Sequence, residues 1–148
     1  MTERLILTII AVVMLLLTIQ KKYKWTIIIT SGLAFGILIT WTGIPLVITA
    51  GMIIYTITAF MSIIYGVRNK ELSNIERIII GLIGLWALTA NLFAIMHLPY
   101  ANEINLSMMI PLIGYIFLII KGLFRKKEFG FLTILNAEFL LRLLRFWN

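Results

Sequence analysis

The chain has 148 residues, of which 61% are hydrophobic and only 13% are charged, and its mean hydropathy is +1.06. A soluble domain carries about a quarter charged residues to cover its surface, so this composition indicates an integral membrane protein. The formal net charge of +7 is explained by basic cytoplasmic loops, and we expect no nucleic-acid partner. Cysteine is absent, which excludes disulfides, thiolate metal sites and thiol catalysis.

Five apolar segments have about the 20 residues that a helix needs to cross a hydrocarbon core. The predicted spans cover residues 3–20, 26–42, 46–67, 75–97 and 104–123. Together they predict an all-α, polytopic helix bundle over residues 1–128. The first segment has the length of a signal-peptide core, but no A-x-A site follows it, so we interpret it as a retained span.

Local signals mark several span boundaries. Pro45 suits the first turn of the third span, where its missing N–H costs nothing. Ser73 and Glu76 have the S-x-x-E spacing of a capping box, which predicts the start of the fourth span. Pro111 lies inside the fifth span, where it either kinks the helix or marks its first turn if the helix begins late.

Small residues recur at four-residue spacing on three of the spans. This spacing places positions with little side chain on one helix face and lets a neighbouring helix approach closely. The three stripes consist of Gly32 and Gly36, of Thr58, Ser62 and Gly66, and of Ala90 and Ala94. They predict helix packing, either within the chain or with membrane-protein partners.

Basic residues alternate between the connecting segments. Three follow the first span, three lie between the third and fourth spans, and four lie at or after the end of the fifth, whereas the turns at 42–45 and 98–103 carry none. Loops rich in lysine and arginine stay in the cytoplasm. The alternation therefore predicts a bacterial inner-membrane protein with its N-terminus outside and its basic loops in the cytoplasm.

The last segment, residues 129–148, is ambiguous. Glu138, Arg142 and Arg145 share a narrow stripe of an otherwise apolar helix, and Glu138 and Arg142 form an i,i+4 pair. We expect an amphipathic helix at the membrane interface, with its arginines reaching toward water. The alternative is a sixth span whose charges face the bundle or a partner, because three charges are costly at membrane depth.

Three further polar residues are candidate functional residues. Asn91 lies within the fourth span and either bonds a neighbouring helix or lines a pore. His97, the single histidine, either bonds a loop carbonyl at the outer interface or titrates near neutral pH as a relay with Glu103. The sequence shows no acid–base constellation, metal-ligand cluster or phosphate loop. We therefore expect neither enzymatic activity nor a cofactor or metal.

The end of the fourth span resembles a known motif. Residues 90–101, A-N-L-F-A-I-M-H-L-P-Y-A, resemble a run in small inner-membrane proteins that include the motor subunit of the gliding-motility and type IX secretion machinery. That run reads roughly G-x-[LF]-F-K-[IL]-x-H, continuing W-P-G-A in looser relatives, and the chain matches it at Phe93, His97, Pro99 and Ala101. It departs from the run at Ala94, Leu98 and Tyr100, and the motor's intramembrane glutamate and long cytoplasmic tail are not evident. The resemblance implies a helix-and-loop module that works in an oligomeric membrane complex.

Two functions follow from these patterns. The first is a non-catalytic subunit or self-associating module of a membrane complex, with the bilayer, other membrane proteins or further copies of the chain as partners. The alternative is a small channel, transporter or membrane-perturbing effector, with Asn91, His97 and Glu103 near an outward-facing polar vestibule.

Overall fold

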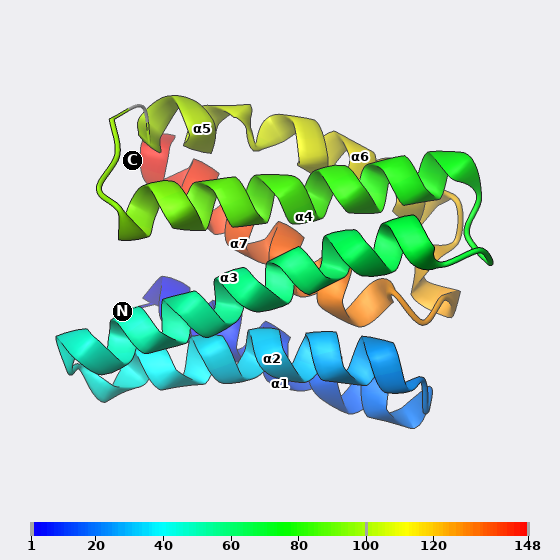
Figure 1. The fold of residues 1–148 in the computed structure, drawn as a ribbon, viewed down its shortest axis with the longest axis horizontal. Helices are drawn as coiled ribbons and strands as arrows, with labels where there is room; N and C mark the ends of the chain where they lie inside the picture. Colours follow the sequence, from blue (N-terminus) through cyan, green and yellow to red (C-terminus); the bar gives the residue numbers. More distant parts are fainter. Residues whose placement is uncertain (1, 100, 148) are drawn as a thin grey trace.

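The computed structural model describes residues 2–99 and 101–147 (Figure 1). These residues are mainly helical and contain no strand. The helices are α1 (Thr2–Gln20), α2 (Lys24–Ile39), α3 (Pro45–Arg68), α4 (Asn74–Ile95), α5 (Ala101–Ser107), α6 (Met109–Ile120) and α7 (Phe129–Trp147), with short 3₁₀ helices η1 (Thr40–Thr42) and η2 (Leu123–Arg125). The predicted all-α bundle is confirmed.

Five segments of the described chain are long and apolar enough to cross a membrane. They are α1, α2 with η1, α3, α4, and the run Glu103–Ile120 that covers most of α5 and all of α6. Large apolar side chains remain exposed on the outside of the bundle, among them Leu46 at 81% and Ile120 at 78%. Exposed apolar surface of this extent is typical of a face that contacts lipid. The chain is therefore a membrane-embedded helix bundle.

Two of the predicted helix starts have the local features expected of them. Pro45 begins α3. Ser73 Oγ accepts a hydrogen bond from the Glu76 N–H at 3.3 Å, and the Glu76 carboxylate accepts one from the Ser73 N–H at 3.0 Å, so the capping box at the start of α4 is confirmed. The fourth span ends at Ile95, two residues before its predicted end.

The fifth predicted span is broken in two near Pro111. Because proline has no N–H, it cannot donate a helical hydrogen bond to the carbonyl of Ser107, and α5 ends at that residue. The Met108 N–H instead donates to the Asn105 carbonyl at 3.3 Å, which tightens the turn before α6 begins. α6 ends at Ile120 rather than at residue 123.

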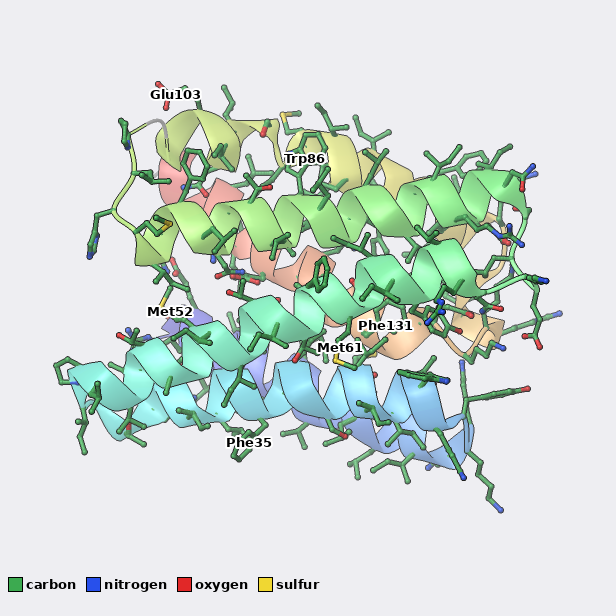
Figure 2. The ribbon with its side chains drawn as sticks, viewed as in Figure 1. Phe35, Met52, Met61, Trp86, Glu103 and Phe131 are labelled. Carbon is green, nitrogen blue, oxygen red and sulfur yellow. The ribbon has the colours of Figure 1, made fainter. Side chains whose placement is uncertain are left out.

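Helix α7 runs through the interior of the bundle, between the α1–α2 pair and the layer of α4 and α6 (Figure 1). Its Phe131, Leu132, Leu135 and Phe139 are buried, and Figure 2 shows Phe131 pointing into the interior. Helix α7 is not among the five segments that are long and apolar enough to cross a membrane, so both the expected interfacial placement of residues 129–148 and the alternative of a sixth span stay predictions. The burial favours the alternative, because α7 buries its apolar side chains and pairs its charges with neighbouring helices.

The two ends of the bundle differ in charge. We call residues 21–24, 68–77 and 121–128 the basic end. These segments lie together (Figure 1) and carry ten basic and three acidic residues. They are joined by ion pairs of Lys126 with Glu76 and of Lys127 with Glu71.

At the opposite end lie the start of α1, the end of α7 and the turns after α2 and α4 (Figure 1). We call this the terminal end. Its contacts include the ion pair of Arg145 with Glu3 and a 2.8 Å hydrogen bond from Trp41 Nε1 to Thr8 Oγ1. The chain therefore separates its charge along the long axis of the bundle, as the predicted alternation of basic loops requires.

Candidate functional site

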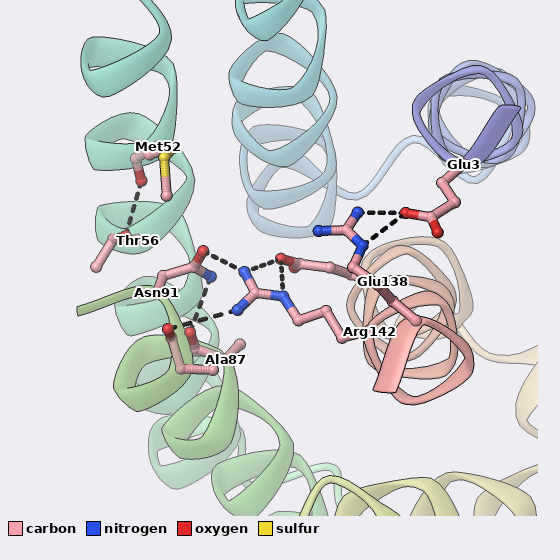
Figure 3. Close-up of polar contacts among 9 residues, drawn as sticks. Glu3, Met52, Thr56, Ala87, Asn91, Glu138 and Arg142 are labelled. Carbon is pink, nitrogen blue, oxygen red and sulfur yellow. Dashed lines mark hydrogen bonds and ion pairs between the residues drawn. The ribbon is translucent and has the colours of Figure 1, made fainter. Parts of the chain in front are cut away.

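The candidate site is an ion pair buried between α7 and α4 (Figure 3). Glu138 lies halfway along α7 and Arg142 follows one turn later, with Arg142 Nε donating to Glu138 Oε1 at 2.9 Å. The guanidinium also reaches α4, where Nη2 donates to Asn91 Oδ1 at 2.7 Å and Nη1 donates to the Ala90 carbonyl at 3.4 Å. The two charged side chains are only 12% and 19% exposed.

Helix geometry sets the orientation of these groups. The i,i+4 spacing places Glu138 and Arg142 on one face of α7. On α4, Asn91 Nδ2 donates to the Ala87 carbonyl at 2.9 Å, which fixes the amide and leaves its oxygen free for Arg142. Arginine has five N–H donors, and here a carboxylate, an amide and a carbonyl accept from it. A buried ion pair depends on such additional hydrogen bonds.

The carboxylate side of the pair is less completely satisfied. Glu138 Oε2 and the hydroxyl of Tyr55 are buried and have no hydrogen-bond partner among the described residues. Tyr55 lies near the middle of α3 and is 5% exposed. Both residues line a cavity of about 120 Å³ that Asn91 and Arg142 also line. Unpaired polar atoms at membrane depth are costly, so these two atoms are the groups that this otherwise mainly apolar cavity offers to a ligand.

A second cavity, of about 340 Å³, borders the same ion pair on the side of the terminal end. Its polar lining consists of Glu3, Arg4, Asn105, Glu138, Arg142 and Arg145. The ion pair of Glu3 and Arg145 borders this cavity, and the Arg145 side chain is 70% exposed. We call the two cavities together the vestibule. Both cavities are lined by Glu138 and Arg142, and the outer one also by Glu3 and Arg145 of the terminal end.

The structure brings together some of the predicted site residues. Asn91, Glu138 and Arg142 form the buried cluster, and Arg145 lines the outer cavity. Glu103 is exposed on α5 and projects away from the bundle (Figure 2). Neither Glu103 nor His97 lines the vestibule cavities, so of the three residues predicted near a vestibule only Asn91 lines one of them.

His97 has a backbone role. It is exposed and follows the end of α4 with φ +50°, and the Leu98 N–H donates to the Phe93 carbonyl at 3.0 Å. This is the hydrogen-bond pattern of a helix C-cap with a left-handed residue. The expected bond from the His97 side chain to a loop carbonyl is not made within the described part of the chain.

Tyr55 is a site residue that nothing in the sequence marks. It stands in an apolar run without any distinguishing neighbour, and nothing local separates it from a packing tyrosine. Glu128 lies at the basic end, outside this site, and is a second buried polar residue that nothing in the sequence marks. It is 1% exposed, and its Oε1 accepts hydrogen bonds from Tyr65 Oη at 2.6 Å and from Asn69 Nδ2 at 3.3 Å.

The small-residue stripes pack within the chain. A Cβ on Gly32 would lie 2.5 Å from Thr58 Oγ1, and a Cβ on Gly36 would lie 2.9 Å from the Gly51 carbonyl oxygen, so α2 and α3 are in close contact. Ser62 and Gly66 of α3 lie opposite Gly84 and Ile80 of α4, respectively. Ala90 is buried, and Ala94 lines the vestibule. Six of the seven stripe residues therefore pack inside the bundle.

Two lysines at the basic end are held by the loops around them. Lys21 Nζ donates to the Phe124 carbonyl at 3.0 Å and to that of Lys126, and burial lowers the pKa of Lys21, partly offset by the charge of Glu128. Burial also opposes the charge of Lys127, but its hydrogen bond to Glu71 and the charge of Glu128 raise the pKa of Lys127 above its usual value.

No protein-family model, curated protein or solved structure matches the chain. Among the described residues, no three of His, Cys, Asp or Glu gather as metal ligands. The fold and the site therefore define the class of protein. It is an all-α, membrane-embedded helix bundle in which a buried ion pair borders a vestibule on the side of the terminal end. The resemblance of residues 90–101 to the motor-subunit run stays a prediction from those residues.

Proposed function

We propose that the protein is a non-catalytic membrane protein of the transport type, whose vestibule admits a proton or a small zwitterionic solute to the Glu138–Arg142 pair. The observation that supports this function is the buried pair itself, beside which the Glu138 carboxylate and the Tyr55 hydroxyl are close neighbours in one cavity and have no third hydrogen-bond partner at Oε2 or Oη among the described residues. Ionisable residues inside membrane bundles mark solute pathways and proton relays.

The chemistry of the site suits these two ligands. Arg142 neutralises the Glu138 carboxylate, which lowers the cost of holding it at membrane depth. The second carboxylate oxygen can accept a proton or an ammonium group, and the Tyr55 hydroxyl can donate to a carboxylate. The outer cavity carries Glu3 as well as Arg4 and Arg145. Glu3 and Glu138 are paired with Arg145 and Arg142, so Arg4 leaves the lining net positive. Both charge signs are present, which suits a zwitterion better than a simple cation, and a proton has to reach Glu138 past these arginines.

The orientation follows from the charge of the two ends. We infer that the basic end faces the cytoplasm of a bacterial inner membrane, because positively charged loops are retained there. The vestibule then opens outward, with both termini on its side of the membrane. This orientation keeps the predicted outward N-terminus and adds α7 as a sixth crossing.

A subunit or self-associating module of a membrane complex is the second candidate. The observation that favours it is the outer face of α6, where Ile113, Ile116 and Ile120 are exposed on successive turns and either lipid or a partner helix can cover them. The inward packing of most of the small-residue stripes favours the transport function over this one.

Uptake into proteoliposomes tests the proposal. Proton uptake is followed with an entrapped pH-sensitive dye under a potassium diffusion potential, and glycine uptake with a radiolabel. We expect uptake of at least one probe above protein-free liposomes, and we expect Glu138→Gln and Tyr55→Phe to abolish it. Glu103→Gln is the matched control, because Glu103 lies at the same end but outside the vestibule, and it should leave uptake unchanged.

Two results would overturn the transport function. The first is that neither probe enters above the protein-free background. The second is uptake that Glu138→Gln and Glu103→Gln reduce equally. If no uptake is measured and native mass spectrometry shows a stable oligomer or a copurifying membrane protein, the second candidate function is supported.

A further inference from the structure

A separate groove of about 550 Å³ lies at the basic end, beside the start of α2 and the end of α3. It is lined by Trp25, Met61, Ile64, Tyr65, Arg68, Asn69 and Lys127, and Figure 2 shows Met61 between α3 and α2. Met61 and Arg68 are seven residues apart on α3, about 10 Å along the helix axis at 1.5 Å per residue. The groove is therefore apolar toward the middle of the bundle and cationic at its outer rim.

The free charge at this rim is positive. Arg68 is exposed, and its guanidinium makes no ion pair or hydrogen bond within the part of the chain that the structure describes. Lys127 lies next to it, paired with Glu71 and 4.6 Å from the ring centroid of Tyr23. The guanidinium of Arg68 is therefore available to an anion from outside the chain.

The acidic residues of the basic end do not compensate Arg68. Glu71 pairs with Lys127, Glu76 pairs with Lys126, and Glu128 accepts hydrogen bonds from Tyr65 and Asn69. Each carboxylate thus has a partner inside the chain. The basic end as a whole carries ten basic against three acidic residues, which favours an anionic ligand.

We propose that this groove binds an anionic phospholipid, with one acyl chain along Met61 and Ile64 and the phosphate at Arg68. The groove volume lies within the range of about 300–1,000 Å³ for small-ligand sites, and arginine binds phosphate through two parallel N–H donors. Trp25 is 63% exposed at the rim, as expected for an amphipathic ring at headgroup level.

Two other occupants fit less well. A zwitterionic phospholipid brings a cationic group to a rim that is already cationic. A second copy of the chain carries a net charge of +7, so the basic end of the first copy would repel it. Anionic headgroups instead attract basic residues near the membrane surface.

Native mass spectrometry of the full-length protein in detergent tests the site. The protein is titrated with phosphatidylglycerol and, separately, with phosphatidylcholine of identical acyl chains. We expect the first phosphatidylglycerol to bind about tenfold more tightly, and Arg68→Gln to remove this preference. Lys70→Gln is the matched control: Lys70 lies two residues after Arg68, in the loop that follows α3, and is exposed but does not line the groove, so this variant should keep the preference.

A second variant tests the apolar part of the groove. Ile64→Trp fills the space of the acyl chain without changing any charge, and we expect it to weaken phosphatidylglycerol binding. Excess inorganic phosphate should not displace the lipid, because it has no acyl chain. Equal affinity for the two lipids, equal losses in Arg68→Gln and Lys70→Gln, displacement by inorganic phosphate, or a dimer in place of lipid binding would each overturn the proposal.

Discussion

Arg142 and Glu138 each depend on the other because both are buried. Arg142→Leu leaves the Glu138 carboxylate without a cation, and breaking a buried pair in this way costs about 3–5 kcal/mol. We expect this loss in the free energy of unfolding measured in detergent, and a smaller loss when Glu138→Leu is added. The control is Arg145→Leu, whose pair with Glu3 is largely exposed and should contribute at most about 1 kcal/mol. Equal losses for the two arginine variants would contradict the buried pair.

His97 offers a second test at the scale of one residue. Its φ of +50° costs a non-glycine side chain about 1–2 kcal/mol, whereas glycine adopts it freely. We therefore expect His97→Gly to unfold no more easily than the wild type and to retain uptake in proteoliposomes. A variant that is stable but silent in the uptake assay would instead support the relay role that the sequence predicts for His97.

Single residues were predictable only where they break a local pattern. Asn91, Glu138 and Arg142 stand out because each is polar in an apolar run, but their convergence depends on how α7 packs against α4. Tyr55 breaks no pattern, so its position at the floor of the vestibule required the tertiary structure. His97 stands out for its chemistry, although its position is explained by the backbone turn after α4.

The close approach of α2 and α3 depends on glycine. A Cβ on Gly36 would lie 2.9 Å from the Gly51 carbonyl oxygen, which is backbone and cannot move aside easily. We expect Gly36→Ala to lower the free energy of unfolding by about 1–3 kcal/mol through overpacking.

Gly81 provides the matched control on α4. Nothing lies within 4 Å of a Cβ built there, so Gly81→Ala should raise the stability by about 0.5–1 kcal/mol, as expected for alanine in place of glycine in a helix. Unfolding of both variants in the same detergent gives the comparison. If Gly36→Ala is as stable as Gly81→Ala, the contact between α2 and α3 is not as close as described.

At the scale of elements, length and apolar character predicted the first four spans well, because both are local properties of the sequence. The break before α6 was one of two outcomes that Pro111 allowed. Helix α7 was harder to place, since a polar stripe on an apolar helix suits either water or a polar partner. The partner that decides between them, Asn91, lies 51 residues earlier in the chain.

At the scale of the molecule, charge and topology are linked. The basic segments collect at one end, and the start of α1 and the end of α7 lie at the other (Figure 1). If α7 crosses the membrane, both ends of the chain lie on the side to which the vestibule opens. If α7 lay at the cytoplasmic surface, its buried ion pair and the vestibule would not form.

Site-directed labelling of single cysteines tests this arrangement most directly, and the natural chain contains no cysteine that would interfere. Thr2→Cys, Lys70→Cys and Arg145→Cys are treated in intact cells with a membrane-impermeant thiol reagent, before and after permeabilisation. We predict that Thr2→Cys and Arg145→Cys react in intact cells, whereas Lys70→Cys reacts only after permeabilisation. Reaction of Arg145→Cys and Lys70→Cys from the same side of the membrane would contradict a crossing α7.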